Sequence, residues 1–169
     1  MSGTKIAYEL SPEWMETFLS TVPREADREA AERIVGLFRE RGLPVKSKSY
    51  DMACMAGTFR ILCFVKKSRE AVILNNRGMG RPGFSVQLRI ENPRAFERLD
   101  GLSPNIRGQI LRARDCGYCQ PNCEGKRYAF AYQGAEYVKC RAFSVNFFLE
   151  NFESEDIQSL MELVRGEVG

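Results

Sequence analysis

The chain has 169 residues, of which 44% are hydrophobic and 28% charged, and a formal net charge of +3 at pH 7. This balance excludes an intrinsically disordered chain, and no apolar run approaches the about 18 residues that a membrane-spanning helix needs. The length is typical of one domain with its own core, and the first residues lack the apolar stretch of a secretory signal. We therefore expect a cytoplasmic protein with no membrane partner, in which cysteines stay reduced.

The first part of the chain is predicted to form two helices, over residues 11–20 and 21–42. A proline stands near the start of each helix, where its missing N–H leaves no helical hydrogen bond unmade. In the second helix, apolar residues recur at every fourth position: Ala26, Ala30, Ile34 and Phe38. Gly42 is a typical residue for ending such a helix, because glycine adopts a positive φ without strain.

From Lys46 onward the hydrophobic period changes to two, which predicts β-strands. Turn-forming residues divide this part of the chain into four expected strands, 47–54, 58–67, 70–76 and 84–92. Alternation puts four residues on one face of the second strand: Phe59, Ile61, Cys63 and Val65. One apolar face per strand is typical of an antiparallel sheet that packs against helices.

Helices are predicted again at 93–102, 103–115 and 154–168, and residues 126–148 are predicted to form a β-hairpin. Together these elements predict an α+β fold with an antiparallel sheet of roughly four to six strands. We expect the N-terminal, central and C-terminal helices to pack on one face of that sheet. The whole chain, 1–169, is expected to form a single domain.

The order of these elements resembles that of small bacterial α+β domains that have been compared with frataxin. The resemblance covers most of the chain and implies the fold, and it rests on element order without a shared motif. It does not imply an iron-chaperone role. Frataxin-type function relies on an acidic helix surface, and the acidic residues near Glu155 are too few for one.

Three cysteines stand within eight residues of each other, from Cys116 to Cys123. The predicted hairpin has a tight turn that contains Gly134, because glycine can take the positive φ such a turn requires. Counting outward from that turn pairs Arg127 with Cys140. The hairpin alone would therefore bring a fourth thiol close to the other three.

The four cysteines of this set, spaced C-x2-C-x3-C-x16-C, are the candidate ligands of a metal clip that spans 114–142: Cys116, Cys119, Cys123 and Cys140. Four thiolates at about 2.3 Å from one ion form the tetrahedral structural zinc site. An iron–sulfur cluster also takes four thiolates, but its usual spacings differ. Structural zinc is therefore the expected cofactor, ahead of an iron–sulfur cluster. Cys54 and Cys63 lie in apolar strands and are expected to be core thiols.

The alternative for the cluster is a redox pair formed by Cys116 and Cys119. In thioredoxin-like proteins the C-x-x-C motif opens a helix after a strand, where the helix dipole lowers the thiol pKa. Here the motif follows a predicted helix and precedes a hairpin. The chain contains no histidine, which excludes catalysis of the Ser-His-Asp and Cys-His types. We therefore expect a protein without catalytic activity.

The charge distribution indicates where a ligand binds. Between Pro44 and Glu91, nine Lys or Arg residues stand against three acidic residues. Two arginines of a Gly-rich loop, Arg77 and Arg81, are candidate ligands for a phosphate or carboxylate, and Trp14 is a candidate lining residue of a pocket. We expect a small-molecule, anionic or protein ligand. A zinc-bearing nucleic-acid binder is a third hypothesis, in which aromatic residues of the hairpin stack on bases.

Overall fold

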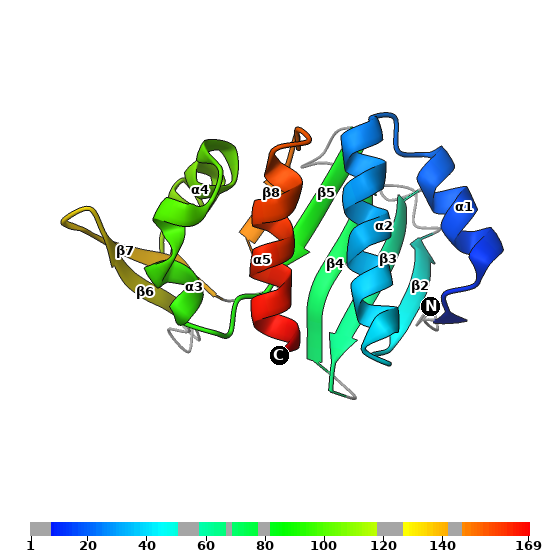
Figure 1. Ribbon diagram of the computed structural model, residues 1–169, viewed down its shortest axis with the longest axis horizontal. Helices are drawn as coiled ribbons and strands as arrows, with labels where there is room; N and C mark the ends of the chain where they lie inside the picture. Colours follow the sequence, from blue (N-terminus) through cyan, green and yellow to red (C-terminus); the bar gives the residue numbers. More distant parts are fainter. Residues whose placement is uncertain (1–7, 51–57, 67–68, 78–81, 118–126, 142–146) are drawn as a thin grey trace.

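The structure is a computed structural model that describes residues 8–50, 58–66, 69–77, 82–117, 127–141 and 147–169 (Figure 1). The helices and strands of these segments are, in chain order, β1 (Tyr8–Glu9), α1 (Pro12–Ser20), α2 (Glu25–Glu40), β2 (Val45–Tyr50), β3 (Thr58–Val65), β4 (Arg69–Arg77), β5 (Pro82–Leu88), α3 (Arg94–Glu97), the 3-10 turn η2 (Leu99–Gly101), α4 (Pro104–Leu111), β6 (Arg127–Tyr132), β7 (Ala135–Cys140), β8 (Phe147–Glu150) and α5 (Asp156–Val168). The predicted α+β class is confirmed.

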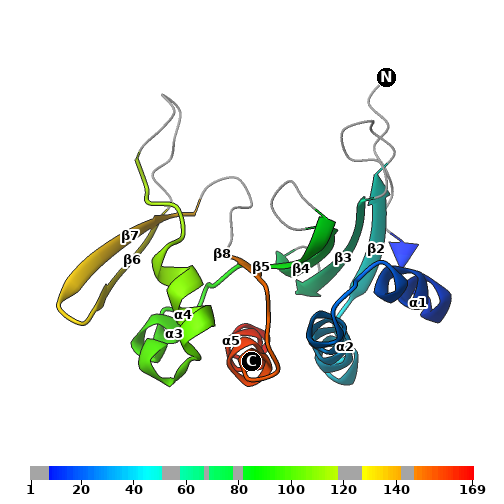
Figure 2. The ribbon, with the colours of Figure 1, turned by 90° about the horizontal axis from the view of Figure 1, so that it is seen from above.

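Six strands form one antiparallel sheet in the order β1-β2-β3-β4-β5-β8, and β6 and β7 form a separate hairpin. Figure 2 shows the helices on one side of both sheets, with α1, α2 and α5 under the larger sheet and α3 and α4 under the hairpin. This confirms that N-terminal, central and C-terminal helices pack on one face. Within the described segments, no helix is long and apolar enough to cross a bilayer.

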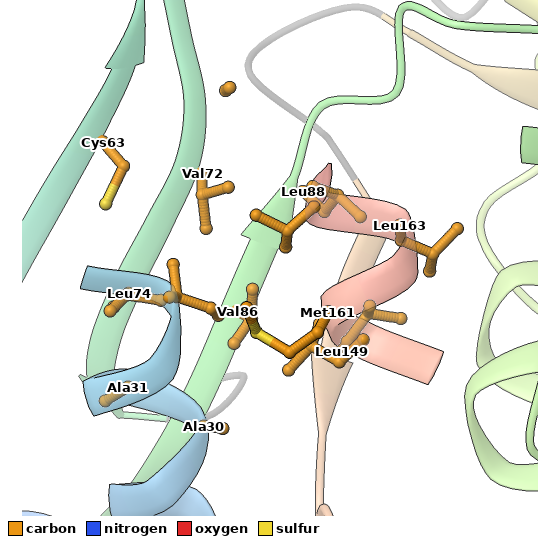
Figure 3. Packing of buried hydrophobic residues seen from close by; sticks show 14 of the residues in the cluster. Ala30, Ala31, Cys63, Val72, Leu74, Val86, Leu88, Leu149, Met161 and Leu163 are labelled. Carbon is orange, nitrogen blue, oxygen red and sulfur yellow. The ribbon is translucent and has the colours of Figure 1, made fainter. Parts of the chain in front are cut away.

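The core lies between the larger sheet and the pair α2 and α5 (Figure 3). Ile34 and Phe38 of α2 are fully buried, as the four-residue period predicts. They belong to the same buried cluster as Leu74 and Val72 of β4, and Figure 3 shows α2 lying against that strand. Fully burying one such aliphatic or aromatic side chain contributes roughly 1.5–3 kcal/mol. Of the expected metal ligands, the two that the structure describes, Cys116 and Cys140, do not belong to this core.

Two glycines end elements as the sequence predicts. Gly42 has a φ of +63° and follows the last turn of α2, where the Leu43 N–H bonds the Phe38 carbonyl at 2.9 Å. Gly134 has a φ of +78° in the turn between β6 and β7, and Gln133 before it has a φ of +49°. Two consecutive positive φ values define the hairpin turn that matches the right-handed strand twist.

The prediction of a single hairpin over 126–148 is wrong in its last part. The hairpin ends at Cys140, and β8 instead joins the main sheet beside β5, with Leu149 opposite Val86. The reason is burial: Phe147 and Leu149 alternate toward the helices and are 2% and 0% exposed in the main core. The helix expected over 93–102 is also interrupted, because α3 ends at Glu97 and η2 follows.

Candidate metal centre

The hairpin formed by β6 and β7 has the predicted register. Tyr132 lies opposite Ala135 next to the turn, and Arg127 lies opposite Cys140 at the open end. Cys140 therefore occupies the last position of β7, at the base of the hairpin. The sequence-based pairing of Arg127 with Cys140 is confirmed.

A short segment after α4 pairs with the other edge of β7. Asp115 lies opposite Lys139 in an antiparallel bridge. The Cys116 N–H donates to the Val138 carbonyl at 2.8 Å, and the Cys140 N–H donates to the Arg114 carbonyl at 2.9 Å. The hairpin thus has a third strand-like neighbour, formed by residues 114–116.

This pairing puts Cys116 and Cys140 on the same face. Side chains alternate along a strand, so Asp115 and Lys139 point to one face while the residues on either side of them point to the other. Cys116 and Cys140 are diagonal neighbours there, a relation in which Cα atoms are typically about 7–8 Å apart. That spacing exceeds the usual Cα separation of a disulfide, at most about 7 Å. Both cysteines are free thiols and partly buried.

Lys139 holds the 114–116 segment in place from the opposite face. Its side chain is 4% exposed, and its ammonium donates to the Ala113 carbonyl at 2.9 Å and to Asp115 Oδ1 at 2.7 Å. The same ammonium lies 5.2 Å from the centre of the Tyr137 ring. A buried lysine with charged and carbonyl partners fixes the register that places Cys116 next to Cys140.

Two arginines flank Cys140 on the face that carries the thiols. Arg127 is its direct partner on β6, and Arg114 is its direct partner on the other edge. Residues directly opposite each other in a sheet share a face. Cys140 therefore shares its face of the hairpin with two cationic residues.

The other two predicted ligands, Cys119 and Cys123, lie outside the described residues. Within the segments that the structure does describe, no three Cys, Asp or Glu side chains are grouped to hold a metal ion. Of the two remaining cysteines, Cys63 is fully buried in the core as predicted, and burial raises the pKa of its thiol. Cys54 lies outside the described residues.

The aromatic residues of the hairpin are packed. Phe130 stacks on Phe96 of α3 at 4.3 Å and on Tyr137 of β7 at 5.3 Å between ring centroids. Tyr128 is buried against Phe96 and Phe147. These rings attach the hairpin to α3 and to the main sheet, so Phe130 and Tyr128 do not form an open platform for bases.

Of the three ligand-binding residues expected elsewhere, the structure describes Arg77 and Trp14. Arg77 ends β4, and its carbonyl accepts a hydrogen bond from the Ser85 hydroxyl at 2.7 Å. Trp14 packs at the edge of the core, 6.2 Å from Phe18 and 5.7 Å from Phe59 between ring centroids. Arg81 lies outside the described residues. Trp14 therefore has a packing role that accounts for its position.

A cavity that the sequence did not indicate lies next to Cys140. Its volume is about 570 Å³, and Phe147 and Phe148 of β8 form part of its wall opposite α4. Arg112 and Arg114 line its rim. The Arg112 guanidinium folds back over Gly108, where a Cβ would approach its Nη1 to 2.8 Å. The sequence signal for this cavity is weak: it is a glycine in a short helix, Gly108, with an arginine four residues later.

No protein-family model matches the chain, and no curated protein and no solved structure is similar enough to match it. The resemblance to frataxin-like domains therefore stays a hypothesis based on element order.

Proposed function

We propose that this chain is a non-catalytic cytoplasmic binding domain whose C-terminal part is held by a structural zinc ion on Cys116, Cys119, Cys123 and Cys140. One observation carries the proposal: the 114–116 segment and β7 present Cys116 and Cys140 on one face at the base of the hairpin. Tetrahedral geometry with Zn–S bonds of about 2.3 Å requires sulfurs about 3.8 Å apart. Side chains of diagonal neighbours can converge to that separation.

The chain length between the ligands supports the same site. Cys119 follows Cys116 by three residues, and Cys123 precedes Arg127, the partner of Cys140, by four. A peptide spans at most about 3.6 Å per residue, which keeps the Cys119 and Cys123 Cα atoms within about 11 and 14 Å of those two anchor points. Both cysteines are therefore covalently confined to the neighbourhood of Cys116 and Cys140.

Charge supports zinc as well. A zinc ion with four thiolates has a net charge of −2, which is costly beside a partly buried hairpin without compensation. Arg114 and Arg127 stand on either side of Cys140 on the thiol face. Their guanidinium groups can offset this charge and lower the free energy of the deprotonated, metal-bound state.

The non-catalytic part of the proposal rests on composition. Without histidine, a general base would have to be a carboxylate, a lysine, a tyrosine or a thiolate. A structural zinc site uses all four of its positions for protein ligands and leaves none open for water or substrate. We infer that the metal serves the fold and that binding takes place elsewhere on the surface.

The test is the metal content of protein purified without chelator, measured per chain together with an absorbance spectrum. We expect one zinc per chain and no visible colour. Cys116→Ser and Cys140→Ser should each lower zinc to well below one per chain after dialysis against a weak chelator. Cys63→Ala is the matched control, because Cys63 is buried on β3 of the main sheet and not on the hairpin, and it should retain full zinc.

Other results have distinct meanings. A brown protein containing iron would replace zinc by an iron–sulfur cluster. Metal-free protein in which Cys116 and Cys119 react at once with a thiol reagent and cycle with a reductant would establish the redox alternative. Salt-sensitive retention on DNA with full zinc would instead favour the nucleic-acid hypothesis. Metal-free protein with unreactive thiols would refute both cysteine-based functions.

A further inference from the structure

Three arginines line a cavity on the helical side of the molecule. It lies between α3 and η2 on one side and the second half of α5 on the other, and its volume is about 580 Å³. Arg94 and Arg98 line it from α3 and the residue that follows it, and Arg165 lines it from α5. The volume is within the range of small-molecule sites, about 300–1,000 Å³.

These arginines differ from others in the chain because their charges are not compensated. Among the described residues, the guanidinium groups of Arg94, Arg98 and Arg165 form no ion pair and no hydrogen bond. In contrast, Arg24, Arg33, Arg69 and Arg141 each pair with a glutamate. Grouping three like charges raises the electrostatic energy of the empty cavity, and a bound anion lowers it.

The walls also suit a ligand with an uncharged part. Leu102 and Leu163 are each 5% exposed and line the cavity together with Ala95. An apolar wall with a few convergent polar groups is the usual composition of a small-molecule site. The arginines can bind the charged group while the leucines contact the rest of the molecule.

Two features oppose an anion and set the charge that fits. Glu162 also lines the cavity, so three arginines and one glutamate give a local charge of +2. The last turn of α5 lies at the rim, and the carbonyl end of a helix disfavours anions. Asn92 reduces this second effect, because its amide lies 3.4 Å from the Gly166 carbonyl and donates to it. A phosphate monoester, with a charge near −2, matches the remaining +2.

We propose that this cavity binds a small phosphorylated organic molecule, with Arg94, Arg98 and Arg165 on the phosphate and Leu102 and Leu163 on the organic part. Guanidinium groups bind phosphate oxygens through paired hydrogen bonds, which a lysine cannot reproduce. The cavity residues lie outside the 114–142 segment, so this proposal does not rest on the zinc site. Its failure and that of the zinc proposal are separately measurable.

The experiment is calorimetric titration of the purified full chain with phenyl phosphate, inorganic phosphate and phenol. We expect one saturable site for phenyl phosphate, weaker binding of inorganic phosphate, and none of phenol. Arg98→Ala and Arg165→Ala should each weaken phenyl phosphate binding by about tenfold or more, which corresponds to losing one charged contact. Arg98→Lys should retain only part of the affinity. All three side chains are exposed, so these variants should remain folded.

Arg112→Ala is the matched control, because Arg112 also lacks a carboxylate partner among the described residues and lines a different cavity, beside α4. We expect it to bind phenyl phosphate like the wild type. The proposal is overturned if no saturable binding occurs at low salt, or if Arg112→Ala weakens binding as much as Arg98→Ala. It is equally overturned if only single-stranded DNA of about 16 nucleotides binds, which would assign the arginines to a nucleic acid.

Discussion

Lys139→Met tests how the cysteine face of the hairpin is held together. Lys139 lies on β7 next to Cys140. Among the described residues, its side chain alone donates hydrogen bonds to both the Ala113 carbonyl and Asp115. Methionine has a similar length and keeps the apolar contacts of the stem, but it removes the ammonium. We expect the 114–116 segment to detach more often from β7, which moves Cys116 away from Cys140.

The size of the effect follows from the two contacts. The hydrogen bond from a charged donor to the partly buried Ala113 carbonyl contributes about 1.5–3 kcal/mol. The ion pair with Asp115 adds at most about 1 kcal/mol, because that carboxylate is exposed to solvent. Removing a buried charge offsets part of this loss. We therefore expect a net cost of about 2 kcal/mol for docking the segment, and an equal loss in zinc binding corresponds to about 30-fold weaker affinity.

Two measurements test this expectation. Hydrogen exchange reports docking directly, because the Cys116 and Cys140 amides donate to Val138 and Arg114 and are protected only while the segment is paired. Zinc affinity is measured by competition with a chromogenic chelator. Lys46→Met is the matched control, since Lys46 is on β2 of the main sheet, where its ammonium lies over the Phe64 ring of β3.

The reasoning is refuted if Lys139→Met leaves both amides as protected as in the wild type. Unchanged zinc affinity together with lost protection would have a different meaning. It would show that the segment undocks without affecting the ligands, so that Cys116 reaches the metal independently of its pairing. The control should change neither readout.

Two buried carboxylates give predictions about stability. Asp156→Ala removes the carboxylate that accepts from the Ser103 hydroxyl, the Asn105 amide and the Glu153 N–H. We expect the free energy of unfolding in urea to fall by about 3–5 kcal/mol. The exposed Glu155→Ala is the control and should change it little. Burial acts to raise the pKa of the Asp156 carboxyl, but its three hydrogen-bond donors outweigh burial and hold that pKa below its usual range. The stabilisation by Asp156 is therefore present above about pH 4 and is lost as the pH falls through the folded-state pKa. A wild-type stability equal to that of the variant at pH 7 would contradict this. Burial raises the pKa of Asp27, and its Oδ1 accepts no hydrogen bond from the described residues. Asp27→Asn should therefore unfold at higher urea than the wild type at pH 7, with the difference closing as the wild-type carboxyl is protonated toward pH 4; a difference that grows on acidification would have the wrong sign.

Local patterns in the sequence predict the parts of the structure in which neighbours along the chain decide the outcome. The hairpin register follows from one turn, because Gly134 with a positive φ leaves only one way to count outward to Arg127 and Cys140. The second helix follows from its four-residue period. In both cases the interactions that select the structure lie within a few residues of one another.

Long-range pairing was not predictable in the same way. β8 pairs with β5 although residues 89–146 separate them, and periodicity says which face of a strand is apolar but not which strand it joins. Lys139 is a second case, because a lysine on a strand is almost always exposed to solvent. Its burial depends on the Ala113 carbonyl at the end of α4, a contact that exists only after the segment folds back onto β7.

The structure itself gives a reason for a metal at the base of the hairpin. The inner face of the β6–β7 pair packs on Phe96, but its outer face is open, and Val138 there is 37% exposed. A two-stranded hairpin is marginally stable in water unless something covers it or ties its ends. The central strands of the main sheet are covered by α2 and α5, so their packing does not depend on the base of the hairpin. If the proposed zinc is bound, its removal should expose the amides of β6 and β7 to exchange more than those of β3 and β4, because the ion would tie only the base of the hairpin.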